Sequence, residues 1–361
     1  MKILFVITGL GMGGAEQVVT NLADALSDRN HEVQIVYLTG EVLVRPTNPN
    51  IKIISLNFDS PKHLIKSYLK LRYIIKKMKP DVIHSHMFHA NLLSRLIRLT
   101  TKVPKLISSS HNTNEGGQLR MMAYRFTDKL VDISTNVSDE AVKALIKAGA
   151  TKKGRMVCVV NGINTDKFKF NKNISYETRS NLGLSKDIAM ILAVGSLSPQ
   201  KDYPNLLNAV AKLKTIRNDF KLFIVGDGKL RDDLLSLIVD LELTEFVELL
   251  GIRNDIPNLM SACDIFTLSS AWEGFGLVVA EAMACERVVV ATDCGGVKEV
   301  MGGNGILIKP NDSTVLSDAL NEALNFDEKQ RACIGANARQ HIIDNFSLKA
   351  NVDSYLSLYL S

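Results

Sequence analysis

Two glutamates, Glu273 and Glu281, lie eight residues apart and offer the clearest chemistry in this 361-residue chain. Between them, Gly274 and Gly276 belong to a turn that follows a short apolar segment. This turn predicts a helix that begins near Gly276, and the unpaired amides and positive dipole end of such a helix attract anionic groups such as phosphates. Glu273 could reach toward a sugar, and Glu281 could accept two hydrogen bonds from a ribose. An acid at a helix N-terminus together with an exposed acid, neither bound to a ligand, is the plainer alternative.

A second glycine-rich segment, from Gly9 to Gly14, lies between an expected strand and an expected helix. Its spacing matches the Gly-x-Gly-x-x-Gly pattern of dinucleotide sites, which would favour NAD as a ligand. Such sites also need an acid after the second strand, and here none appears before Glu41. The alternative is a loop that lines a cleft and approaches the phosphates of a different ligand.

Four histidines fall at or near the ends of expected strands. His111 lies just past a carboxyl end, where ligands of open α/β sheets bind, although a loop histidine with satisfied hydrogen bonds would show the same pattern. His84, His86 and His89 suggest a metal site, but no nearby acid completes a zinc ligand set. The five cysteines are odd in number and lack Cys-x-x-Cys spacing, which argues against zinc and disulfides. We therefore expect no metal.

The elements that must position these residues alternate between short β-branched strands and amphipathic helices, which predicts parallel sheets with crossover helices. Strands are expected at residues 3–8, 33–38, 51–56, 81–86, 105–110, 131–136 and 156–160, and again at 188–195, 220–226, 247–250, 265–269, 287–291 and 306–308. The length exceeds what one core usually serves. We expect an α/β fold of two doubly wound domains facing a cleft.

The boundary between the domains is expected where the alternation breaks, in the turn-forming segment 161–164 and the polar linker that runs to Tyr176. The first domain would span residues 1–163 and the second residues 164–345. Residues 346–361 would form a C-terminal helix that could pack back on the first domain.

The charge is distributed unevenly along the chain. Residues 1–160 hold 23 Lys and Arg against 12 Asp and Glu, whereas the remainder holds 20 against 26. The basic excess peaks at residues 62–105, where 11 cationic side chains accompany one acid, Asp81. The segment 62–77 predicts a basic amphipathic helix with apolar positions 64, 65, 68, 69, 71 or 72, and 75 on one face and Lys62, Lys66, Lys70 and Lys77 on another.

Such a helix could lie on an anionic membrane surface, or it could be an ordinary helix with a solvated face. Nucleic acid is not expected as a partner, because few aromatic residues and no nucleic-acid motif accompany the cations. No apolar run approaches the length needed to cross a bilayer, and the five apolar residues after Lys2 are too few for a signal-peptide core. The expected location is the cytoplasm, either free or at the inner face of the cytoplasmic membrane.

The stretch from Ser270 to Glu281 resembles the Glu-x7-Glu signature of glycosyltransferase family 4, in the form Ser-x-x-Glu-Gly-Phe-Gly. The resemblance covers nearly the whole chain, with further matches at Gly13-Gly14-Ala15-Glu16, Asn161-Gly162-Ile163-Asn164, Val194-Gly195-Ser196-Leu197 followed by Lys201, and Gly226-Asp227-Gly228. It implies the GT-B fold, in which two Rossmann-like domains face a cleft. The Gly9–Gly14 loop would then line the acceptor side of that cleft.

By this resemblance the chain would be a retaining, metal-independent glycosyltransferase without a cofactor. It would move a hexose or N-acetylhexosamine from a nucleotide diphosphate sugar to a hydroxyl of a glycan or of a polyprenyl-pyrophosphate-linked acceptor. The variant Gly-Gly-Ala-Glu resembles enzymes that extend lipid-linked oligosaccharides from UDP-sugars, which favours UDP over GDP-mannose. Surface polysaccharide biosynthesis, of O-antigen, capsule or lipopolysaccharide, is the expected process.

The same resemblance implies roles for single residues. Glu281 would hold the donor ribose, Glu273 the sugar or β-phosphate, Lys201 the pyrophosphate, residues 250–253 the base, and His111 the transferred sugar. The implied catalytic residues are His111, Glu273 and Lys201. The implied donor-binding residues are Gly13, Gly14, Gly195, Ser196, Lys201, Gly226, Gly228, Ile252, Arg253, Glu273, Gly274, Phe275, Gly276, Leu277 and Glu281.

The chain departs from the family pattern at two positions. Ser196 replaces an arginine, so Lys201 would act with backbone amides or with a substitute such as Lys229, and Asn164 replaces an aspartate. No acid of the first domain stands out as a general base, so the leaving phosphate itself would take the proton. A GT-B nucleotide-sugar epimerase and a non-catalytic nucleotide-sugar binding module remain alternatives, and Ser196 favours the second of these.

Overall fold

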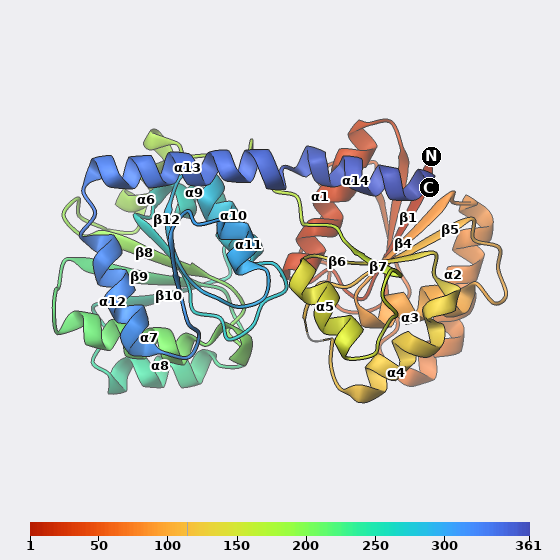
Figure 1. Ribbon diagram of the computed structural model, residues 1–361, viewed down its shortest axis with the longest axis horizontal. Coiled ribbons are helices and arrows are strands. Elements are labelled where there is room, and N and C mark those ends of the chain that lie inside the picture. The colour runs from red at the N-terminus through yellow and green to blue at the C-terminus, as the bar shows by residue number, and fades with distance from the viewer. Residues whose placement is uncertain (114) are drawn as a thin grey trace. The chain divides into compact units, whose positions relative to one another are not determined.

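The computed structural model describes residues 1–113 and 115–361 (Figure 1). The chain divides into two compact units, which are described separately. The first unit joins Met1–Gly162 to Leu348–Ser361, and the second is Ile163–Ser347. The boundaries therefore fall after residues 162 and 347, where the sequence predicted 163 and 345.

The first unit is built on a seven-stranded parallel sheet of order β3-β2-β1-β4-β5-β6-β7. Its strands are β1 (Lys2–Ile7), β2 (Glu32–Tyr37), β3 (Lys52–Ser55), β4 (Val82–His86), β5 (Lys105–Ser109), β6 (Ile133–Asn136) and β7 (Met156–Cys158). Its helices are α1 (Gly14–Asp28), α2 (Leu64–Met78), α3 (Phe88–Ile97), α4 (Gln118–Thr127), α5 (Asp139–Lys147) and α14 (Leu348–Leu360), with short turns η1 (Pro61–His63) and η2 (Asp128–Leu130). Each of the seven strands expected here is present, five of them shorter by one or two residues and two shifted by one residue.

Helices cover both faces of this sheet, which is why its central strand reads as an unbroken apolar run. Side chains of β1 alternate between two cores. Ile3 and Phe5 pack with α1 and α14 on one face, and Leu4 and Val6 pack with α2 and α3 on the other. The last helix of the chain, α14, thus completes the core of the first unit and contributes the buried ring of Tyr355.

The helix α2 buries only part of the face that its sequence suggested, at Leu71 and Ile75. The buried residues are Ser67, Leu71, Ile74, Ile75 and Met78. The exposed large apolar residues are Leu64, Ile65, Leu69 and Tyr73. Positions 64, 65 and 69 of the expected apolar face are therefore wrong. The true face was hidden because it begins with Ser67, whose hydroxyl donates to the carbonyl of Leu56 at 3.2 Å.

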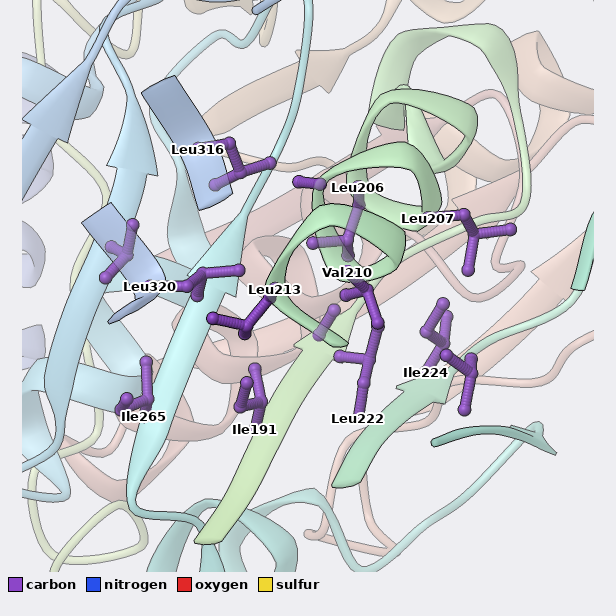
Figure 2. Packing of buried hydrophobic residues seen from close by; sticks show 14 of the residues in the cluster. Ile191, Leu206, Leu207, Val210, Leu213, Leu222, Ile224, Ile265, Leu316 and Leu320 are labelled. Carbon is purple, nitrogen blue, oxygen red and sulfur yellow. The ribbon is translucent and has the colours of Figure 1, made fainter. Parts of the chain in front are cut away.

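The second unit is built on a six-stranded parallel sheet of order β10-β9-β8-β11-β12-β13. Its strands are β8 (Ala189–Val194), β9 (Phe220–Val225), β10 (Val247–Gly251), β11 (Ile265–Leu268), β12 (Val288–Thr292) and β13 (Ile306–Ile308), as expected. Its helices are α6 (Lys172–Asn181), α7 (Tyr203–Lys214), α8 (Arg231–Asp240), α9 (Ile256–Ala262), α10 (Leu277–Ala284), α11 (Val297–Met301), α12 (Ser313–Leu324) and α13 (Glu328–Phe346), with a short turn η3 (Pro199–Lys201). Figure 2 shows leucines of α7 and α12 packed on strand residues such as Ile191 and Leu222.

The polar segment expected as a linker up to Tyr176 is shorter than predicted, because α6 begins at Lys172. The side chain of Asn171 caps this helix by accepting hydrogen bonds from the amides of Asn173 and Ile174. The helix buries only Thr178 and is held by polar contacts such as the ion pair of Arg179 with Asp264 at 2.9 Å. Without an apolar stripe, its sequence carries no helical periodicity.

The strand order reverses once in each sheet, between β1 and β4 in the first unit and between β8 and β11 in the second. Ligands of open α/β sheets bind outside the carboxyl ends of strands at such switch points. The loops that leave these four strands carry the glycines at 9–14, Met87, Lys201 and Glu273. The predicted fold class, two doubly wound α/β domains, is confirmed.

The longest helix, α13, has 19 residues and carries charged side chains throughout. Within residues 1–113 and 115–361, no helix combines the length and the apolar character that a bilayer crossing requires.

The role of α14 can be tested by truncating Tyr355, which is 1% exposed. Tyr355→Ala should lower the free energy of unfolding of the first unit by about 3–5 kcal/mol, because the cavity left by a large buried ring is not refilled. Thermal unfolding followed by far-UV circular dichroism would detect an early transition. Fluorescence of Trp272, the one tryptophan of the chain, reports on the second unit. Tyr73→Ala, at a 64% exposed tyrosine of the same unit, is the matched control, and equal effects of both variants would contradict the prediction.

Candidate functional site

The switch point of the second unit brings Lys201 and Glu273 together as a buried ion pair. The Nζ atom of Lys201 lies 2.5 Å from Oε1 of Glu273, and the two side chains are 13% and 9% exposed. The carboxylate also accepts hydrogen bonds from the hydroxyl of Ser270 at 2.8 Å and from the amide of Gln200 at 3.3 Å. Because the pair is shielded from water, the attraction between its two groups is stronger than in a surface ion pair, while burial costs both groups hydration free energy. The contact also means that the charge of Lys201 is already compensated by a carboxylate.

Three predicted donor-binding glycines allow two loops of this unit to pack backbone to backbone. A Cβ atom on Gly226, whose φ is +138°, would lie 2.0 Å from the carbonyl oxygen of Gly195. One on Gly228 would lie 2.4 Å from the carbonyl oxygen of Leu197. These contacts place Ser196 and its neighbours beside the loop after β9, where Lys229 is exposed. The structural need for glycine here is independent of any ligand.

The turn before α10 is held in the shape that the sequence predicted. Gly276 is the N-cap residue and has a left-handed backbone with φ of +87°, and Leu277 begins the helix half-buried. Phe275, predicted to bind donor, has its ring buried against Phe346 with centroids 5.5 Å apart. Because the Phe275 side chain packs in the interior, only the backbone of this residue could contact a ligand.

The loop after β12 supports this turn and was missed in the sequence. A Cβ atom on Gly295 would lie 1.9 Å from the carbonyl oxygen of Glu273, and the amide of Gly296 donates to the carbonyl of Gly274 at 3.2 Å. Thr292 adds a hydrogen bond to the carbonyl of Ser270 at 2.7 Å. The pair Gly295-Gly296 directly after an expected strand was the signal that could have revealed this loop.

Glu281 lies inside α10 and is 7% exposed. Burial raises the pKa of this carboxyl group to about 8, although the positive charge of Lys167 acts in the opposite direction. At pH 7 the group is therefore mostly neutral when no ligand is bound. A partner that donates hydrogen bonds to its oxygens would favour the ionised form.

The predicted base-binding residues lie at the end of β10. Ile252 is 53% exposed. Arg253 binds Asp255 through two hydrogen bonds of 2.8 and 2.7 Å, and this pairing lowers the pKa of Asp255. The guanidinium of Arg253 is thus paired with the carboxylate of Asp255. The spacing of these two residues was visible in the sequence.

In the first unit, Gly13 caps α1 and Gly14 is its first residue. The side chain of Glu16 folds back over this turn, so that a Cβ atom on Gly13 would lie 2.3 Å from its Oε2 atom. Burial raises the pKa of Glu16. The glycine-rich loop therefore holds a half-buried acid next to the switch point.

His111 lies beyond β5, with its Nε2 atom 3.0 Å from Nδ1 of His86 at the end of β4. Its backbone amide donates to the carboxyl group of Glu115 at 3.2 Å. Burial lowers the pKa of His111 to about 4 and raises that of Glu115. Sequence reasoning noted no such acid in the first domain. Glu115 is recognisable as part of this site only because the loop folds back on itself.

His84 and His86 share one face of β4, as expected, with ring centroids 4.0 Å apart, and His89 lies in the first turn of α3. In the described part of the chain, no group of three or more His, Cys, Asp or Glu side chains is arranged to hold a metal ion.

Two doubly wound domains in one chain, with a buried lysine–glutamate pair and a helix N-terminus at the second switch point, define a protein of the GT-B fold. Solved structures agree with this fold. The chain is similar to Anabaena HepE in complex with UDP and glucose, with a TM-score of 0.86, 23% identity and 99% and 98% of the two chains covered. It is also similar to sucrose-phosphate synthase of Thermosynechococcus elongatus, with a TM-score of 0.87, 20% identity and 99% and 98% covered.

Family models match both halves of the chain. The model "Glycosyltransferase Family 4" matches residues 12–167, and "Glycosyl transferases group 1" matches residues 175–341. The chain therefore belongs to glycosyltransferase family 4, as the Glu-x7-Glu resemblance indicated, and it is a glycosyltransferase. This assignment gives no support to the dinucleotide interpretation of the loop at 9–14.

Two curated relatives carry specific names. The chain is 28% identical to UDP-Gal:alpha-D-GlcNAc-diphosphoundecaprenol alpha-1,3-galactosyltransferase of Escherichia coli, over 82% of this chain and 79% of that protein. It is 27% identical to N-acetylgalactosamine-N,N'-diacetylbacillosaminyl-diphospho-undecaprenol 4-alpha-N-acetylgalactosaminyltransferase of Campylobacter jejuni, over 98% of this chain and 99% of that protein.

The buried Glu281 predicts a pH-dependent stability of the ligand-free protein. Its pKa is about 8 in the folded state and near 4.5 in the unfolded state, so its stabilising contribution is complete below pH 4.5 and is lost as pH rises through 8. Glu281→Gln should therefore raise the melting temperature at pH 8.5 by several degrees and have little effect at pH 5.

Differential scanning calorimetry at several pH values would measure this difference. Glu245→Gln, at an exposed loop glutamate, is the matched control. Identical pH dependence of melting in wild type and Glu281→Gln would show that Glu281 is ionised in the folded protein and would refute the prediction.

Proposed function

We propose that the chain is a retaining, metal-independent hexosyltransferase that uses a UDP-sugar and extends a polyprenyl-pyrophosphate-linked glycan in surface polysaccharide assembly. The observation that carries this proposal is the buried Lys201–Glu273 pair at the mouth of α10, with Glu281 inside the same helix. The names of the two curated relatives support the acceptor class, and UDP-Gal in the first of them supports the nucleotide.

The second domain would bind the donor. A departing nucleoside diphosphate gains negative charge, and a fixed cation together with the amides at the start of α10 stabilises that charge without a metal. Lys201 can turn from Glu273 toward the phosphate, and Glu273 is then free to accept hydrogen bonds from sugar hydroxyls. Glu281 would hold both ribose hydroxyls. Lys229, exposed on the loop that packs beside Ser196, is placed to supply the cation that the missing arginine provides elsewhere in the family.

The transfer step replaces one bond at the anomeric carbon by another. The acceptor oxygen forms a bond to that carbon on the same face from which the diphosphate oxygen leaves with its electron pair. The proton of the acceptor hydroxyl passes to the leaving phosphate. His111 would contact the transferred sugar. An alpha product from UDP-Gal, as in the name of the Escherichia coli relative, is what this retention would give.

Transfer from UDP-sugars to a synthetic polyprenyl-pyrophosphate glycan tests the proposal. Lys201→Ala should lower kcat by about 100-fold or more, because one fixed donor of transition-state charge stabilisation is commonly worth this much. Glu281→Ala should instead weaken UDP binding, measured by calorimetry. Lys221→Ala, which removes a half-exposed ion pair with Glu248 on the same sheet, is the control for lysine loss.

The alternatives give different results in the same assay. Conversion of the donor sugar to its epimer without acceptor would identify an epimerase. UDP-sugar binding without turnover, for every acceptor tested, would identify a binding module. Activity that disappears with a metal chelator would contradict metal independence.

We also propose that the first domain lies on an anionic membrane surface at the inner face of the cytoplasmic membrane. On α2 the exposed apolar residues Leu64, Ile65 and Leu69 lie among lysines. On α4, Leu119 and Phe126 are 81% and 77% exposed beside arginines. The helices α2, α3 and α4 are neighbours in one layer, so their outer faces can meet one surface (Figure 1).

Removing two exposed cations of this layer should weaken binding to lipid. Lys62→Ala with Lys66→Ala should reduce binding to phosphatidylglycerol-containing vesicles by roughly 30-fold, since each near-surface cation contributes about 1 kcal/mol. Co-sedimentation measures the change, and Lys152→Ala with Lys153→Ala is the control of equal charge in the same unit. Equal binding of both double variants, or binding that does not depend on anionic lipid, would refute this surface.

A further inference from the structure

Two neighbouring histidines of the first unit each have one buried ring nitrogen that bonds to no described residue. His86 and His111 are joined by the 3.0 Å contact between Nδ1 and Nε2, and their rings are stacked with centroids 5.2 Å apart. The remaining nitrogens, Nε2 of His86 and Nδ1 of His111, are buried and have no hydrogen-bond partner among the described residues. Buried polar atoms are nearly always satisfied, so such an atom next to a ligand-binding edge is one that a ligand can satisfy.

The register of the sheet explains why these rings meet. The strands β4 and β5 are parallel, and His86 lies directly opposite Ser109. His111 follows two residues later, just beyond the end of β5, and the loop returns its ring over His86. The amide of His111 is fixed by Glu115, whose carboxyl group also accepts a hydrogen bond from Tyr124. The His111 loop is thus held at its backbone and at its ring.

The ring of His86 also contacts side chains other than His111. Its ring lies 4.0 Å from that of His84, and His84 is bonded to the hydroxyl of Tyr359 in α14 at 2.7 Å and to that of Ser109 at 2.6 Å. Phe5 contacts both imidazoles from β1. The ring of His86 therefore has little freedom to turn.

Both histidines are neutral at ordinary pH, because burial lowers the pKa of each, and the neighbouring His84 and His111 lower that of His86 further. A neutral imidazole carries one N–H, so one ring must donate in the shared bond and the other must accept. If His86 donates, His111 carries its proton on Nδ1 and offers a donor there. If His86 accepts, Nδ1 of His111 offers a lone pair.

We propose that His86 is a positioning residue for sugar transfer, which fixes the ring orientation and the tautomer of His111 so that His111 Nδ1 meets one hydroxyl of the substrate. This inference rests on the proposed function, in which His111 contacts the transferred sugar. The pair acts as a unit, in the way that an outer partner fixes the tautomer of a metal-bound or catalytic histidine. A carboxylate usually serves as that outer partner. Here the neutral imidazole of His86 takes this role.

Three variants separate positioning from stability. His86→Leu keeps a side chain of similar size but removes both nitrogens. His86→Asn keeps a polar group close to the place of Nδ1 and can still pair with His111. Ser85→Ala is the matched control, since Ser85 precedes His86 in β4 but points to the opposite face of the sheet, where it bonds Ser108.

The first measurement is the ¹⁵N spectrum of the His111 imidazole, which reports the tautomer whether or not the enzyme turns over. We expect one tautomer in the wild type, in Ser85→Ala and in His86→Asn, and a mixture in His86→Leu. An unchanged His111 tautomer in His86→Leu would overturn the inference.

The second measurement is transfer kinetics. His86→Leu should lower kcat by up to about 100-fold, because a misplaced contact at the reacting sugar can reduce the rate by this much. UDP affinity should stay the same, since the nucleotide belongs to the other domain, and His86→Asn should restore most of kcat. A changed tautomer with unchanged kcat would also overturn the inference. Full activity of His111→Ala would instead show that the assigned role of His111 in the proposed function is wrong.

Discussion

Parallel strands joined by right-handed crossovers can place helices on both faces of a sheet only if the strand order reverses somewhere. At the reversal, two adjacent loops leave in opposite directions, and the gap between them cannot be filled by the crossovers themselves. Both domains of this chain obey this constraint, between β1 and β4 and between β8 and β11. Lys201 and Glu273 owe their place to the second of these gaps, and His86 and His111 lie at or beside the first. The rest of each domain is the packing that holds the strands in that order.

The second gap contains a buried pair of opposite charges. Lys201 and Glu273 compensate each other in a buried site, where either charge alone would be strongly destabilising. In the proposed function, an entering phosphate would have to compete with the carboxylate of Glu273 for the ammonium group of Lys201. The energy of the ion pair would then be subtracted from ground-state binding, whereas the growing charge of a departing diphosphate would gain more from the same lysine. Such a difference between ground state and transition state is what accelerates a reaction.

Much of the fold could be read from the sequence, because each buried parallel strand is a short unbroken run of apolar residues and each sharp turn needs its glycines. The start of α10 at Gly276 was predictable for that reason. Contacts between loops could not be predicted. Gly295 and Glu273 lie in different loops, and no local sequence pattern records that the two approach each other. The helix α6 was missed because it is capped and held by polar groups, and the pairing of His86 with His111 required the strand register. The packing of Phe275 against the distant Phe346 was likewise invisible.

The core shared by α1 and α14 has a consequence for how the protein is made. A ribosome delivers the first 162 residues well before residues 348–361, yet Val352, Tyr355 and Tyr359 belong to the hydrophobic cluster of the first domain. Domains usually fold in the order of synthesis. Here the domain that begins first must wait with an uncovered sheet face until the final helix leaves the exit tunnel, and the second domain can finish before it. A chain interrupted before α14 would therefore leave exposed the apolar side chains that Val352, Tyr355 and Tyr359 cover.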